Sequence, residues 1–197
     1  MSAGGTGFGN FAVTLANRIT IVRLLLIPVF VVLIMMYGRD KPFFRHAALT
    51  VFLVASISDA LDGFVARVYD QKTRLGAVLD PLADKLLINI AFVFLAVNEE
   101  LTYRIPAWFP VIILSRDAII ALGSYLINEF FGPLRVRPRI SGKLTTVFQM
   151  ATICAVLLEL RLSPGLIYAT LVISLISFAD YLRDGIRQIG NEDAPNG

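Results

Sequence analysis

The sequence predicts an all-α integral membrane protein, with six transmembrane helices around a polar cavity that faces the cytoplasm. The chain is 56% hydrophobic and only 17% charged, and its mean hydropathy is +0.72. That composition is far from the balance of a soluble domain. The apolar residues gather in six segments, each of about the length that a membrane-spanning helix needs. Two of these segments contain a pair of aspartates each, and carboxylates are costly at membrane depth and therefore indicate a function.

The six segments define one domain with two tails. Residues 1–18 are expected to form an N-terminal tail with a short interfacial helix, 19–183 the helical domain, and 184–197 a flexible C-terminal tail. The predicted spans are 19–37, 44–66, 77–97, 106–128, 144–160 and 166–182.

The distribution of Lys and Arg between the predicted connections indicates the orientation. Cytoplasmic connections carry an excess of these residues. With a cytoplasmic N-terminus, the cytoplasmic side would hold Arg18, Arg67, Lys72, Arg74, Arg135, Arg137, Arg139, Lys143, Arg183 and Arg187. The other side would hold only Arg39, Lys41, Arg45, Arg104 and Arg161. This asymmetry predicts that both termini are cytoplasmic, and it explains the net charge of +3 without a nucleic-acid partner.

Four aspartates stand at regular spacing in the second and third segments. Asp59 and Asp62 share one stripe of a helix, and Asp80 and Asp84 follow each other at an i, i+4 step. The polar stretch 70–74 lies between the two pairs and predicts a tight connection. An antiparallel hairpin would therefore bring the four carboxylates together near one membrane surface.

Such a cluster predicts a metal site. Neighbouring carboxylates repel one another and take up protons unless a cation neutralises them. Oxygen ligands without His or Cys suit hard ions such as magnesium, manganese or calcium. Gly63, Ala66 and Gly76 are small and would let a helix or a ligand approach closely.

Polar residues in two other segments have two interpretations each. Asn17 could cap the first helix while Arg23 extends to the surface, or both could face a substrate. Arg116 and Asp117 could form a structural buried ion pair, or Arg116 could hold an anionic acceptor. The stretch 135–143 is rich in Arg, and Ser141-Gly142-Lys143 at a helix start suits a phosphate group.

From Asp59 to Asp84 the chain follows the pattern D-x2-D-G-x2-A-R-x8-G-x3-D-x3-D at every fixed position. This pattern resembles the signature of the CDP-alcohol phosphatidyltransferase family, and Asn17-x-x-Thr20-x-x-Arg23 resembles the family's first span. The resemblance covers nearly the whole chain. It implies transfer of a phosphatidyl group from CDP-diacylglycerol to an alcohol acceptor with release of CMP, in phospholipid biosynthesis. It also implies a homodimer in a bacterial-type inner or plasma membrane.

The resemblance also implies roles for individual residues around the active-site cavity. Asp59, Asp62, Asp80 and Asp84 would bind Mg²⁺ or Mn²⁺, as a pair of ions, and Asp84 would be the general base. The CDP-diacylglycerol site would contain Asn17, Thr20, Gly63, Ala66, Arg67, Thr73 and Gly76. The acceptor site would contain Arg116, Arg135, Arg137, Arg139 and Lys143.

The acceptor itself has two leading candidates. The stretches Asp80-Pro-Leu-Ala-Asp84-Lys85 and Ser141-Gly142-Lys143-x-Thr-Thr-x-x-Gln149 are similar to the phosphatidylglycerophosphate synthase and cardiolipin synthase branches. A cationic pocket suits glycerol-3-phosphate, a small phosphorylated alcohol, which we expect to be the acceptor. Ser115-Arg116-Asp117 is closer to eukaryotic-type cardiolipin synthases, whose acceptor is phosphatidylglycerol.

A divalent-cation transporter is the alternative from a different class. It would also place carboxylates within membrane spans. Transporters commonly carry repeated halves and polar groups near the midplane. Here the acids gather on one predicted hairpin and no second copy is evident, which favours the enzyme.

Overall fold

The computed structural model describes residues 15–69, 74–130 and 140–192. Within these ranges, the side chains of 15–20, 59–69, 74–82, 84, 128, 140 and 187–192 lie outside the description. The described chain is all-helical, which confirms the predicted class. Its helices are α1 (Leu15–Met36), α2 (Pro42–Tyr69), α3 (Arg74–Val97), α4 (Trp108–Phe130), α5 (Ile140–Leu157) and α6 (Ser163–Glu192).

The helices correspond one to one with the predicted segments. The main difference is α6, which continues to Glu192 and so passes the boundary predicted at residue 183. The prediction placed the boundary where the apolar pattern ends, near residue 183. Helical hydrogen bonding does not depend on apolar side chains, so the helix continues beyond this point. Proline stands at the first position of α2, where it lacks only an amide that has no helical partner.

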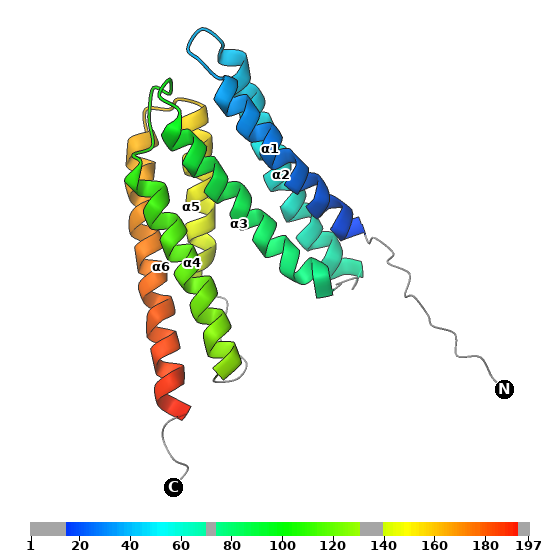
Figure 1. The fold of residues 1–197 in the computed structure, drawn as a ribbon, viewed down its shortest axis with the longest axis vertical. Helices are drawn as coiled ribbons and strands as arrows, with labels where there is room; N and C mark the ends of the chain where they lie inside the picture. The colour runs from blue at the N-terminus through cyan, green and yellow to red at the C-terminus, as the bar shows by residue number, and fades with distance from the viewer. Residues whose placement is uncertain (1–14, 70–73, 131–139, 193–197) are drawn as a thin grey trace, which may run out of the picture.

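The helices form two arms that diverge (Figure 1). We call α1, α2 and α3 the first arm and α4, α5 and α6 the second arm. Within them, α1 packs mainly on α2 and α3, α5 packs on α6, and α4 lies against both α6 and α3. The arms meet at the loop end, which carries the connections 37–41, 98–107 and 158–162. At the opposite end, here called the hairpin end, α2 finishes and α3 begins, close to where α1 starts.

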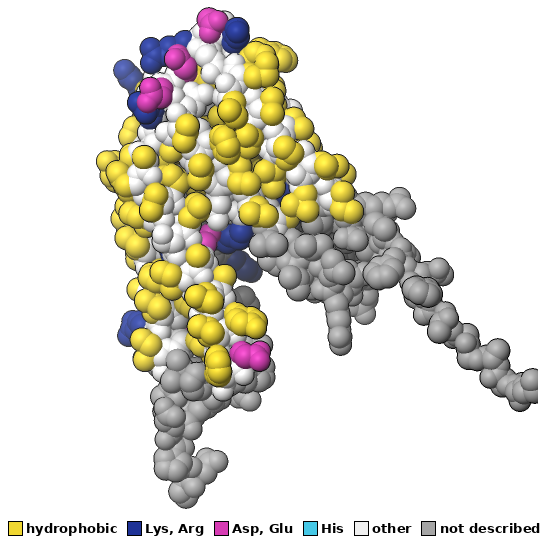
Figure 2. Space-filling view, in the orientation of Figure 1, with side chains coloured by type: hydrophobic (Ala, Val, Ile, Leu, Met, Phe, Trp, Pro, Cys, Tyr) yellow, Lys and Arg dark blue, Asp and Glu magenta, His cyan; other side chains and the backbone are white. Residues whose placement is uncertain are grey.

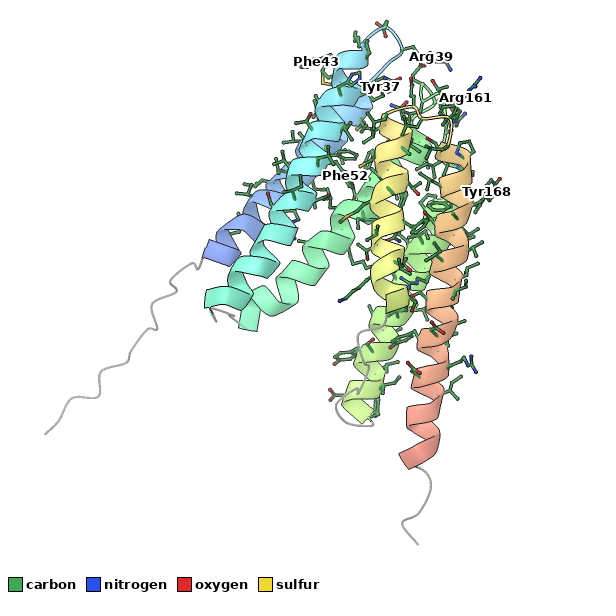
Figure 3. All side chains as sticks on the ribbon, turned by 180° about the vertical axis from the view of Figure 1, so that it is seen from behind. Tyr37, Arg39, Phe43, Phe52, Arg161 and Tyr168 are labelled. Carbon is green, nitrogen blue, oxygen red and sulfur yellow. The ribbon has the colours of Figure 1, made fainter. Side chains whose placement is uncertain are left out.

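The core is apolar and lies between α1, α2, α3 and α5. Phe30 of α1 packs beside Phe52 of α2, with ring centroids 6.1 Å apart. Phe92 of α3 meets Phe109 of α4 edge to face at 5.0 Å. All four rings are fully buried. Figure 3 shows Phe52 on α2 pointing toward the second arm.

The outer surface is also apolar, which is unusual for a protein in water. Yellow side chains cover the flanks of both arms in Figure 2, and Lys, Arg, Asp and Glu gather mostly at the loop end. Tyr168 points outward from α6 (Figure 3) and is 58% exposed. Among the described residues, Trp108–Ile127 and Ser163–Ile186 are long and apolar enough to cross a membrane, and four helices contain apolar stretches of 10–17 residues. These surfaces indicate a membrane protein.

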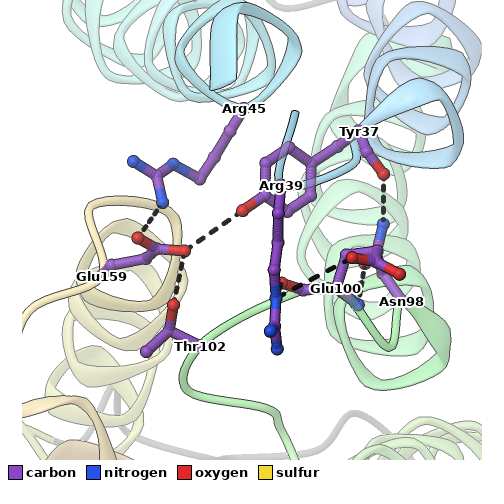
Figure 4. A network of polar contacts seen from close by, with 7 residues as sticks. All are labelled: Tyr37, Arg39, Arg45, Asn98, Glu100, Thr102 and Glu159. Atoms are coloured by element: carbon purple, nitrogen blue, oxygen red, sulfur yellow. Dashed lines mark hydrogen bonds and ion pairs between the residues drawn. The ribbon is translucent and has the colours of Figure 1, made fainter. Parts of the chain in front are cut away.

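A polar network closes the loop end (Figure 4). The Glu159 carboxylate, just after α5, forms an ion pair with Arg45 of α2. It also accepts hydrogen bonds from the Tyr37 hydroxyl at 3.1 Å and from the Thr102 hydroxyl at 2.9 Å. Beside it, the amide of Asn98 donates to the backbone oxygen of Ile34 at 2.8 Å. Glu159 therefore ties both arms together at the loop end, opposite to the hairpin end.

Candidate active site

The helices that carry the aspartates lie next to each other in the fold. Asp59 and Asp62 lie in the last third of α2, and Asp80 and Asp84 lie in the first half of α3. The two helices pack against each other, and only residues 70–73 separate their ends. The backbone therefore brings both pairs to the hairpin end. Their side chains lie outside the described residues, so the carboxylate cluster stays a prediction.

Several residues predicted to bind CDP-diacylglycerol share these helices. Gly63, Ala66 and Arg67 lie in α2 and Gly76 in α3. Asn17 and Thr20 lie near the start of α1, which packs on both. Thr73 falls outside the described residues, and the side chains of the other six are likewise outside the description.

The first helix corrects one interpretation of its polar residues. Asn17 is the third residue of α1 and therefore lies within the helix rather than at its cap. Arg23 does not extend to the surface, since it is only 1% exposed. Its Nε donates a hydrogen bond to the backbone oxygen of Ala55 in α2 at 3.3 Å. A long cationic side chain thus crosses from α1 to α2, because the neighbouring helix supplies an acceptor for it.

Arg116 belongs to a polar network inside the second arm. Its Nη1 lies 2.7 Å from Asp117 Oδ1, and its Nη2 donates to the Ser177 hydroxyl of α6 at 2.8 Å. Lys85 of α3, the neighbour of Asp84, places its Nζ 3.0 Å from the other oxygen of Asp117. The side chains of Arg116 and Asp117 are 8% and 10% exposed. Arg116 and Asp117 therefore form a buried ion pair, and Lys85 extends the pair to a third helix, while the acceptor-binding role of Arg116 stays a prediction.

This network places two cations beside the carboxylate helix. Figure 2 shows dark-blue and magenta side chains halfway along the molecule, where the arms separate. The Asp117 carboxylate contacts both cations, one through each oxygen. The Arg116 Nε has no hydrogen-bond partner among the described residues, although it is buried. The network is thus both a structural link and a source of positive charge one residue from Asp84.

The other predicted acceptor residues are only partly described. Lys143 is exposed near the start of α5, which begins at Ile140 as the sequence indicated. Arg135, Arg137 and Arg139 fall outside the described residues. Within the described part of the chain, no group of His, Cys, Asp or Glu side chains forms a metal site.

Two helices of the second arm carry buried polar residues that the motif analysis left without a role. The inward stripe of α6 consists largely of hydroxyls, at Ser163, Thr170, Ser174 and Ser177. In α5, which packs on α6, Thr145, Gln149 and Thr152 are also buried, and the Thr152 hydroxyl contacts that of Thr170. The signal was present in the sequence as polar residues at three- and four-residue spacing inside apolar segments.

The chain is similar to characterised families and proteins over most of its length. The sequence profile of the CDP-alcohol phosphatidyltransferases matches residues 13–177. A Mycobacterium tuberculosis relative named "Probable phosphatidylglycerophosphate synthase" is 32% identical, over 89% of this chain and 83% of its own.

Two further relatives carry the name CDP-diacylglycerol–glycerol-3-phosphate 3-phosphatidyltransferase. The one from Bacillus subtilis is 35% identical over 74% of this chain and 77% of its own. The one from Escherichia coli K12 is 31% identical over 83% of this chain and 90% of its own. These matches, together with the helical hairpin that carries the aspartates, show that the chain belongs to the CDP-alcohol phosphatidyltransferase family.

Proposed function

We propose that this enzyme transfers a phosphatidyl group from CDP-diacylglycerol to glycerol-3-phosphate and releases CMP, as a phosphatidylglycerophosphate synthase. The observation that carries the proposal is the similarity to relatives with that named activity, which extends over most of both chains. The Lys85–Asp117–Arg116 network supports it, since it holds two cations between α3, which carries Asp80 and Asp84, and α4, and a phosphorylated alcohol needs cations.

We further propose that the six helices all span the membrane, with a cavity and both termini on the cytoplasmic side. The hairpin end would then face the compartment that supplies the nucleotide. The apolar flanks of both arms support a lipid-facing position for the diacyl tails. A homodimer, which the family resemblance implies, belongs to the same proposal.

The carboxylate helices suit the divalent metal on which this family generally depends. Asp59, Asp62, Asp80 and Asp84 supply only hard oxygen ligands, which Mg²⁺ or Mn²⁺ prefers. We propose that they hold two ions. Bound metal would neutralise the donor's pyrophosphate and the departing CMP.

The residues of the chain would then divide the reaction between them. Asn17 and Thr20 would bind the cytidine part, Arg67 and Thr73 the phosphates, while Gly63, Ala66 and Gly76 leave room for them.

In the transfer itself, the acceptor hydroxyl oxygen attacks the phosphorus of the diacylglycerol phosphate. The bond from that phosphorus to the CMP oxygen breaks, and Asp84 takes the hydroxyl proton.

The acceptor phosphate would be held by the cations of the second arm. Arg116 is fixed by Asp117 and Ser177, whereas Lys143 is exposed and free to move toward a ligand at the start of α5. Arg135, Arg137 and Arg139 precede the same helix. Several cations at a helix start favour a dianionic phosphate over a single phosphodiester charge.

Kinetics of a lysine variant test this assignment. Lys143→Ala should raise the KM for glycerol-3-phosphate by about tenfold or more, since a charged hydrogen bond is worth about 1.5–3 kcal/mol. The KM for CDP-diacylglycerol should change little. Lys41→Ala removes an exposed lysine at the loop end and is the matched control. Equal effects of both variants, or CMP release that does not depend on added glycerol-3-phosphate, would contradict the proposal.

A further inference from the structure

Gln149 of α5 is the most unusual buried residue of the described chain. Its side chain is fully buried, yet neither its Oε1 nor its Nε2 has a hydrogen-bond partner in the described structure. An amide buried without partners costs free energy, and an apolar side chain of the same size would avoid that cost. The fold itself therefore gives no reason for glutamine at this position.

The contact between Thr152 and Thr170 shows which part of α6 lies beside Gln149 along α5. One turn away, the Thr152 and Thr170 hydroxyls lie 2.7 Å apart and join α5 to α6. Because the two helices are antiparallel and have the same rise per residue, three residues back on α5 corresponds to three residues forward on α6, at residue 173. Gln149 therefore lies about one residue from the level of Ser174, whose Oγ is buried and also has no partner among the described residues.

The next turn of α6 leads to the cationic network. Ser177 follows Ser174 by three residues and accepts the hydrogen bond from Arg116 Nη2. The Arg116 Nε is buried and likewise has no hydrogen-bond partner within the described residues. Unsatisfied atoms of Gln149, Ser174 and Arg116 thus occur on α5, α6 and α4, and α6 packs against both of the other helices. Buried polar atoms without partners call for an explanation, and a ligand that satisfies them supplies one.

We propose that Gln149 determines acceptor specificity by binding the non-reacting hydroxyl of a small polyol phosphate, with Ser174 beside it. This inference rests on the proposed function and names a residue of the same site. Arg116 and Lys85 carry positive charge at Asp117, and Arg116 reaches Ser177, one turn of α6 from Ser174. We assign the acceptor phosphate to these cations. An amide can both donate to and accept from a hydroxyl, so it suits a diol better than a cation does.

A comparison between acceptors distinguishes a binding role of Gln149 from a structural one. A site built to bind a hydroxyl rejects an analogue that lacks it, because its own polar groups then stay unpaired. Thr152 is the matched control, since it is buried in the same seam and its hydroxyl is already satisfied by Thr170. A structural defect would affect every acceptor equally, whereas loss of a specific contact changes only the ratio between acceptors.

The experiment compares glycerol-3-phosphate with 3-hydroxypropyl phosphate, which keeps the reacting primary hydroxyl and lacks the neighbouring one. The purified full-length enzyme should favour glycerol-3-phosphate in kcat/KM by about tenfold or more. Gln149→Leu should reduce that ratio to about one, without lowering the melting temperature. Thr152→Val should keep the wild-type ratio. If Gln149→Leu does not fold, Gln149→Met, which keeps the length of the side chain, provides the same comparison.

The outcomes separate this inference from the proposed function. A wild-type ratio near one, or an unchanged ratio in the Gln149 variant, would overturn the inference and leave the proposed acceptor intact. Wild-type enzyme that transfers to phosphatidylglycerol but to neither small acceptor would overturn the proposed function, and the inference with it.

Discussion

Glu159 and Gln149 are ten residues apart, and their polar groups have opposite environments. Glu159 is surrounded by Arg45, Tyr37 and Thr102, which satisfy its carboxylate at the loop end. It also has a φ of 53°, a left-handed conformation that is uncommon for a residue with a side chain. Gln149 has no such partners among the described residues. The first residue stabilises the fold, whereas the second is explained by a ligand.

The Glu159 network makes a pH-dependent contribution to stability. Hydrogen bonding from Arg45 is the main cause that lowers the pKa of Glu159 from its ordinary 4.5 to about 2, with help from Thr102 and Tyr37. A lowered pKa in the folded state stabilises the protein above the unfolded value, and this stability disappears as the pH falls from about 4.5 to about 2.

Glu159→Gln tests this contribution. At pH 7 the variant should lose about 1–3 kcal/mol, because Arg45 keeps its burial but loses its counter-charge. Between pH 4.5 and 2 its melting temperature in detergent should fall less steeply than that of the wild type. Parallel melting curves of the two proteins across that range would show that Glu159 does not carry the effect.

The four aspartates are expected to differ in their roles. Asp84→Asn should keep binding of CDP-diacylglycerol but reduce kcat by about 10²-fold or more, because the general base is lost. Asp59→Asn, Asp62→Asn and Asp80→Asn should weaken binding of metal and donor instead. Equilibrium binding and single-turnover CMP release separate the two effects. Asp40→Asn, at an exposed position of the loop end, is the control, and a near-normal rate for Asp84→Asn would show that the base is another group.

At the scale of elements, the sequence was most informative where a pattern is local. The polar stretch 70–74 predicted the connection between α2 and α3; residues 70–73 lie outside the described chain, between Tyr69 of α2 and Arg74, which is already in α3. The aspartate spacing likewise assigned the residues to the correct helices. Such features depend on neighbours within a few residues, which a single sequence contains.

Contacts between distant elements could not be predicted in this way. Tyr37 and Glu159 are 122 residues apart in the chain, and Lys85 and Asp117 are 32 apart. Arg23 could have extended to a surface, and only the position of α2 shows why it is buried instead. Pairing of this kind depends on how the helices pack, which periodicity alone does not specify.

The α2–α3 hairpin gives a prediction for the metal. Chelation of divalent ions should abolish CMP release, and added Mg²⁺ or Mn²⁺ should restore it, because the hairpin supplies only hard oxygen ligands. Circular dichroism before and after chelation shows whether the helices persist. Full turnover in excess chelator would mean that these aspartates do not hold a catalytic metal.

For the whole molecule, the arrangement of helix ends leads to a test of orientation. The α1–α2 connection lies at the loop end, and α2 finishes at the hairpin end (Figure 1). With Cys154 replaced by Ala, a cysteine at Lys41 should react with an impermeant reagent from outside the cell. A cysteine at Lys72 should react only after the membrane is opened, since the Lys and Arg distribution predicts that this side is cytoplasmic. The reverse labelling would contradict the proposed orientation, because the hairpin end would then lie on the opposite side of the membrane from the cytoplasmic nucleotide.

The identity of the product tests the central claim most directly. Purified protein is incubated with CDP-diacylglycerol, Mg²⁺ and equal concentrations of glycerol-3-phosphate and phosphatidylglycerol, and the lipids are separated by mass. The cations of Lys85 and Arg116 beside the carboxylate helix favour the smaller, dianionic acceptor. We predict phosphatidylglycerophosphate as the main product, whereas cardiolipin as the main product would contradict the account.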